Sequence, residues 1–148
     1  MAIRGSSGAQ PVPSPEQVGA HMFAADRASQ SLGMRIVALG AGTARLEMAV
    51  RDDMLNGHEI CHGGFIFTLA DTAFGYASNT HNQRTVSASC SIDYLAPVFL
   101  EDRLIAEASE VLRGGRRGIY DVKVTNQKGE TVALFRGHAA TIKGKWIE

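Results

Sequence analysis

The sequence predicts an α+β fold in which an antiparallel six-stranded sheet wraps around one long central helix. Residues 65–77 are apolar at almost every turn and match the length of an ordinary helix. Two strand-like runs precede this segment and four follow it. Because a helix without a clear polar face must be covered on most sides, we expect a strongly curved sheet or a partner chain to bury it.

Length, charge and cysteine content limit the class of protein. The chain of 148 residues is 45 % hydrophobic and 20 % charged, which is typical of one globular domain. Lys plus Arg and Asp plus Glu each number 15, so we expect neither a nucleic acid nor a membrane as partner. The N-terminus has no apolar signal segment, and two cysteines do not make a disulfide framework. We therefore expect a cytoplasmic protein.

The first third of the chain predicts a tail, a helix and a hairpin. Residues 1–15 contain Gly, Ser and three prolines and predict a flexible N-terminal tail, so that a single domain spans residues 16–148. An amphipathic pattern predicts a short helix over residues 16–31. Residues 34–39 and 43–50 predict two strands that pair as a hairpin, and a polar loop follows up to the central helix.

The chain after the central helix has β character throughout. Alternating small and apolar residues predict four strands, over residues 86–94, 103–112, 118–125 and 131–142. Short turns follow one another along this half of the chain, among them the turn at Gly114 and Gly115. We therefore expect these four strands to pair antiparallel.

Residues 58–62 match the H-E-x-x-H pattern of zinc proteases. In those enzymes one face of a helix carries both histidines. Here Gly57 precedes the pattern and Gly63 follows it, so no helix of useful length holds His58 and His62 in register. We expect the match to be accidental and the protein to bind no metal.

The two cysteines and an arginine cluster each allow more than one interpretation. Cys61, at a helix start, would be a reactive thiolate or, as we favour, a small residue that fills a gap. Cys90 lies in a strand of small residues and is expected to fill the core. Three arginines flank the glycine turn and predict either a phosphate clamp or a solvated hairpin tip: Arg113, Arg116 and Arg117.

Gly63, Gly64 and Asp71 predict a catalytic site. Backbone amides at a helix start lack intrahelical partners and can stabilise an oxyanion, and glycine lets a ligand approach closely. Asp71 would act as base or nucleophile, or else serve as a hydrogen-bonded structural carboxylate. About 12 Å of helix separates Gly63 from Asp71, so both reach one carbonyl only if two chains pair with antiparallel helices.

Three segments carry a resemblance to a known family: NGHEICHGGFIFTLADTAFGYASN, SIDYLAP and GIYDVKVTNQKGETVALFRGHA. They resemble the hotdog-fold acyl-CoA thioesterases of phenylacetate degradation, and the resemblance extends over residues 33–142. It implies a hotdog fold, homodimers that commonly pair into tetramers, and hydrolysis of aryl-acetyl-CoA thioesters, especially ring-hydroxylated ones. Coenzyme A is then part of the substrate, and no cofactor is required.

The resemblance also implies roles for single residues. The family's carboxylate falls on Asp71, its oxyanion amide on Gly63, its histidine on His62 and its asparagine on Asn56. The polar residue that lines the site after the helix falls on Ser87. The other substrate-binding candidates are Gly64, the pocket aromatics Phe65, Phe67 and Phe74, and the phosphate-binding Arg113, Arg116 and Arg117.

Two other functions remain open at this point. A hotdog dehydratase acting on acyl thioesters would need a histidine and a carboxylate to converge on one β-carbon, and His62 is the available histidine. A non-catalytic protein that binds or senses acyl-CoA would keep the pocket without a working carboxylate. Asp71 together with the glycine pair argues against this second alternative.

Overall fold

The computed structural model describes residues 11–148 and contains an antiparallel sheet with one long helix. The helices are α1 (Pro15–Ala25), α2 (Arg27–Ser31) and α3 (Gly63–Asn79), with a 3-10 turn η1 (Asp52–Met54). The strands are β1 (Arg35–Gly40), β2 (Thr43–Ala49), β3 (Gln83–Tyr94), β4 (Arg103–Gly114), β5 (Arg117–Thr125) and β6 (Thr131–Lys145). Within residues 11–148, the helices are too short or too polar to cross a membrane.

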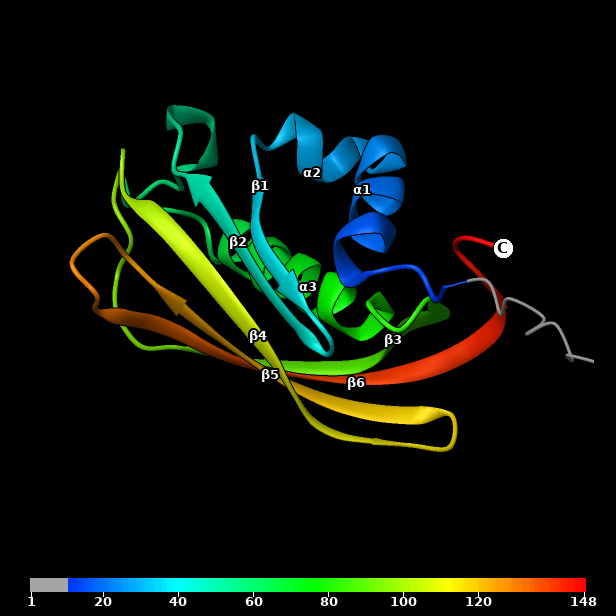
Figure 1. Cartoon of the computed structure of the whole chain (residues 1–148). Helices are drawn as coiled ribbons and strands as arrows, with labels where there is room; N and C mark the ends of the chain where they lie inside the picture. The colour runs from blue at the N-terminus through cyan, green and yellow to red at the C-terminus, as the bar shows by residue number, and fades with distance from the viewer. Residues whose placement is uncertain (1–10) are drawn as a thin grey trace, which may run out of the picture.

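The sheet curves around α3, as the sequence predicts. Its six strands are all antiparallel, in the order β1-β2-β4-β5-β6-β3. Helix α3 lies on the concave side and contacts every strand, while α1 packs beside β1 (Figure 1). The predicted α+β class, the six strands and the first hairpin are therefore confirmed, and the architecture is a hotdog fold.

Strand β3 does not pair with β4, the next strand in the chain, as a series of short turns would predict. Tight turns join β4 to β5 and β5 to β6, and these strands pair as expected. Residues 95–102 are too long for such a turn, and they carry the chain from one edge of the sheet to β4. Strand β3 therefore pairs with β6 and forms an outer edge of the sheet.

The N-terminal helix begins one residue earlier than predicted and is divided in two. Ser14 and Gln17 form a reciprocal capping box, and Pro15 occupies the first helical position. The predicted helix over residues 16–31 breaks at Asp26, whose carboxylate accepts the Ser29 amide at 3.1 Å and starts α2. Most of the predicted flexible tail, residues 1–10, lies outside the described residues.

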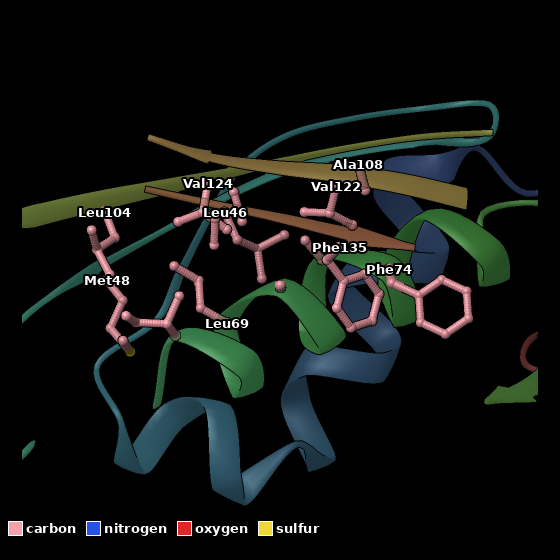
Figure 2. Close-up of a cluster of buried hydrophobic side chains, with 14 of the residues drawn as sticks. Leu46, Met48, Leu69, Phe74, Leu104, Ala108, Val122, Val124 and Phe135 are labelled. Atoms are coloured by element: carbon pink, nitrogen blue, oxygen red, sulfur yellow. The ribbon is translucent and has the colours of Figure 1, made fainter. Parts of the chain in front are cut away.

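The core lies between α3 and the concave face of the sheet. Leu69 and Phe74 of α3 point toward apolar side chains of β2, β4, β5 and β6 (Figure 2). The Phe74 ring lies 5.7 Å from Tyr120 and 5.8 Å from Phe135, measured between ring centroids. Gly137 of β6 leaves room for this ring, because a Cβ there would come within 2.8 Å of it. The helix and the sheet therefore approach closely at this point.

We expect Gly137→Ala to destabilise the protein by about 1–3 kcal/mol, because the added methyl overlaps the Phe74 ring. Phe74 is only 1 % exposed, so its ring has little freedom to move aside. Urea unfolding measures the effect. Gly114→Ala is the matched control, since nothing lies within 4 Å of its Cβ position, and its free energy of unfolding should change by less than about 0.5 kcal/mol. Equal stability of the two variants would contradict this packing.

Candidate active site

His62 caps the start of α3 and leaves one backbone amide available. Its Nδ1 accepts the Gly64 amide at 3.0 Å. Within residues 11–148 the Gly63 amide has no acceptor, as expected for the first residue of a helix. This amide lies at the positive end of the helix dipole. Of the two glycines, Gly63 is thus the one whose N–H can bind an oxygen from outside the chain.

Tyr94 packs against the start of α3 beside Gly63. The Tyr94 hydroxyl donates to the Gly63 carbonyl at 2.9 Å, so the end of β3 is tied to the start of α3. A Cβ on residue 63 would lie 3.0 Å from the Tyr94 ring. Sequence patterns give no signal for Tyr94, because the contact joins residues that are far apart in the chain.

Asn56 shapes the loop that leads into α3. Its Oδ1 accepts the His58 amide at 2.9 Å and the Ile60 amide at 3.5 Å. Glu59 has φ 60°, in the left-handed region, so residues 58–62 form a turn and not a helix. The two histidines of the H-E-x-x-H pattern are therefore not held on one helix face, and the geometry of a zinc protease is not formed.

Asp71 lies in the middle of α3, two turns beyond Gly63, and is half-buried. Burial raises the pKa of its carboxyl group, and a hydrogen bond from Cys90 acts in the opposite direction. The Cys90 Sγ lies 3.9 Å from Asp71 Oδ1 and 3.0 Å from the Ser87 Oγ. A carboxylate with a raised pKa is a stronger base than an ordinary surface aspartate, which suits proton transfer.

A bulge in β3 brings Ser87 and Cys90 to the same face of the strand. Ser87 pairs with Ala139 and Ser89 with His138, so Ala88 is an extra residue in the ladder. Without this bulge, two residues three positions apart would point to opposite faces. The prediction that Cys90 fills the core therefore describes only part of its role, because its thiol also contacts the candidate catalytic carboxylate.

One stripe of α3 remains uncovered by this chain. Its residues recur at helical spacing and are half-buried or exposed: Gly64, Thr68, Asp71, Thr72 and Gly75. The hydroxyls of Thr68 and Thr72 donate to backbone carbonyls one turn earlier, at 2.8 and 2.6 Å. The side chains of this stripe are therefore short and lie close to the helix backbone. A second helix can approach such a surface closely.

The candidate substrate-binding residues lie in different places. Phe74 belongs to the core and presents no open surface in this structure, whereas Phe65 and Phe67 are half-buried. All three candidate arginines are exposed at the tip of the β4–β5 hairpin. Arg113 and Arg116 border a hollow of ≈ 590 Å³ that also includes Lys143. The hollow thus brings two of the three candidate arginines together with a lysine, whereas Arg117 does not border it.

Residues 58–133 match the family described as the Thioesterase superfamily, just over half of the chain. The chain belongs to this superfamily. It is 44 % identical over 123 residues to acyl-coenzyme A thioesterase PaaI of Escherichia coli (strain K12), covering 83 % of this chain and 88 % of that protein.

Solved structures agree with this assignment. The E. coli PaaI protein from the phenylacetic acid degradation operon superimposes with a TM-score of 0.88 and 42 % identity, over 88 % of this chain and 95 % of that one. A Streptococcus mutans protein solved with acetyl-CoA bound has a TM-score of 0.72 and 32 % identity, over 76 % of this chain and 90 % of that one. The resemblance seen in the sequence is confirmed, and this superfamily member is a thioester hydrolase.

The thiolate interpretation of Cys61 is wrong for this thioesterase. Cys61 is 3 % exposed, and burial, with a smaller effect of Asp102, raises the pKa of its thiol to about 11. At neutral pH the group is therefore a protonated thiol and a poor nucleophile. The favoured alternative, a small residue that fills space before the helix, is confirmed.

Proposed function

We propose that the protein hydrolyses acyl-CoA thioesters of the aryl-acetyl class, including ring-hydroxylated phenylacetyl-CoA, to the free acid and CoA. One observation carries the proposal. The free amide of Gly63 and the half-buried carboxylate of Asp71 lie on one helix, and they supply the oxyanion donor and the base that thioester hydrolysis needs. The relationship to E. coli PaaI supports CoA thioesters as the substrate class.

Two copies of the chain are needed to complete each site. Within one helix, Gly63 and Asp71 lie about 12 Å apart, too far for both to act on one carbonyl. If two α3 helices pair antiparallel with the two-fold axis near Phe67, each Gly63 meets Asp71 of the partner subunit. The uncovered stripe of α3 and the free edge of β3 support this homodimer. We further infer that two such dimers associate.

The proposed reaction uses few groups. The thioester carbonyl accepts a hydrogen bond from the Gly63 amide, while His62 and Asn56 shape the loop beside it. Asp71 of the partner subunit either takes a proton from water, which attacks the carbonyl carbon, or attacks that carbon to give an anhydride that water opens. In the first route the C–S bond breaks and the Asp71 carboxyl passes the proton it took from water to the departing sulfur. In the second route CoA leaves as thiolate when the anhydride forms, and the opening of the anhydride by water gives the free acid, regenerates the Asp71 carboxylate and supplies the proton that the thiolate takes up.

We expect Asp71→Asn to lower kcat by about 10²–10⁴-fold, because the amide can neither take a proton nor act as nucleophile. Release of free CoA, followed with a thiol reagent, measures the effect, and size-exclusion chromatography shows whether the oligomer is retained. Cys61→Ala is the matched control and should keep kcat within about twofold, since its protonated thiol has no chemical role. A folded, oligomeric Asp71→Asn enzyme with normal turnover would remove Asp71 from the mechanism.

A panel of thioesters tests the substrate class. Phenylacetyl-CoA and hydroxyphenylacetyl-CoA should give a higher kcat/KM than benzoyl-CoA and straight-chain esters, because half-buried aromatics such as Phe65 and Phe67 favour an aryl group. Crotonyl-CoA separates the other functions. Its hydration without thiol release would indicate a dehydratase, and tight binding without turnover would indicate a sensor.

We expect Arg116→Ala to raise KM for CoA esters by about fivefold, equivalent to roughly 1 kcal/mol of lost phosphate contact. The effect should vanish with the matching N-acetylcysteamine thioester, which lacks the nucleotide phosphates. Arg45→Ala, on β2 and paired with Glu107, is the control and should leave KM unchanged. An equal rise in KM for both thioesters would show that the hairpin does not bind the nucleotide.

A further inference from the structure

The contacts of Cys90 with Asp71 and Ser87 have a defined direction. An ionised carboxylate only accepts hydrogen bonds, so the Cys90 thiol must donate to Asp71 Oδ1. The sulfur then accepts from the Ser87 hydroxyl, 3.0 Å away. The three side chains form a relay that runs from the Ser87 hydroxyl through the thiol to the carboxylate, and it needs the thiol to keep its proton.

The surroundings of Cys90 meet this requirement. Burial raises the pKa of the Cys90 thiol, the hydrogen bond with Ser87 lowers it by a smaller amount, and the charge and hydrogen bond of Asp71 raise it, so that the net shift is upward. A thiol that stays protonated at neutral pH can donate to a carboxylate and is a poor nucleophile. Within residues 11–148, Cys90 of β3 is the ionisable side chain that contacts Asp71. The pKa of the Asp71 carboxyl group is therefore set by burial, which raises it, and by the Cys90 hydrogen bond, which lowers it.

We propose that Cys90 is a positioning residue for thioester hydrolysis. Its thiol fixes Oδ1 of Asp71 and aligns the Ser87 hydroxyl, which leaves Oδ2 as the oxygen that exchanges a proton or attacks. This inference rests on the proposed role of Asp71 as base or nucleophile.

The backbone geometry supports a specific role over simple packing. The bulge at Ala88 is the feature that turns both Ser87 and Cys90 toward the concave face, opposite Ala139 and Gly137 of β6. Within residues 11–148, the side-chain hydrogen bonds of Asp71 involve Oδ1 alone. A cysteine that only filled space would need neither the contact with the carboxylate nor the contact with the hydroxyl.

Two variants separate a donor from a space-filling role. Cys90→Ala removes the thiol, and it should lower kcat roughly fivefold to tenfold with KM within about twofold. It should also move the acidic limb of the kcat/KM profile to higher pH, because the carboxylate loses the hydrogen bond that lowers its pKa. Cys90→Ser keeps a donor on a shorter bond than the thiol, across a contact that is already 3.9 Å long, and should therefore restore part of kcat and part of the original pH profile. Cys61→Ala, the same change at the other thiol, should alter neither.

A direct titration of the Asp71 carboxyl carbon by NMR, assigned with Asp71→Asn, tests the contact independently of turnover. Its pKa should be higher in Cys90→Ala than in the wild type, and its value in Cys90→Ser should lie between the two. Equal pKa values in wild type and Cys90→Ala, or equal loss of kcat in both Cys90 variants with an unmoved acidic limb, would overturn the inference. If the wild type cleaves no thioester, the proposed function fails, and the titration still decides whether Cys90 controls the carboxylate.

Discussion

The burial of α3 against the concave face of the sheet is the constraint on which the rest of the structure depends. An apolar helix of this length is stable in water only when its side chains are covered, and contacts with all six strands provide that cover. The same packing fixes where the helix begins and which stripe stays open. A free amide, a carboxylate and an uncovered surface are therefore placed by the core itself.

Much of the fold follows from local patterns. The central helix, the first hairpin and the strands after the helix are evident from apolar periodicity and turn residues, because both are properties of short segments. The break at Asp26 is not evident from the sequence, because a cap inside an amphipathic run leaves the helical period almost unchanged. The place of β3 at the sheet edge depends on where a long connection leads, which no local pattern contains.

The residues of the candidate site likewise differ in whether the sequence alone reveals them. Gly63 and Asp71 are recognisable because a glycine pair at a helix start and an acid in an apolar helix are unusual in themselves. Cys90 and Tyr94 are not recognisable, because each acquires its role from a contact across the fold. Strict alternation places Ser87 and Cys90 on opposite faces, and one extra residue in the ladder reverses that conclusion.

The bulge at Ala88 has a consequence for how such enzymes diverge. Losing or gaining one residue there turns the side chains that follow it to the opposite face of the strand. Ile92, which packs against the core, and Tyr94, which donates to the Gly63 carbonyl, would then change faces together with Cys90. Replacing one amino acid at Ser87 or Cys90 therefore changes the groups near the helix carboxylate with less damage to the core than an insertion or deletion in this strand.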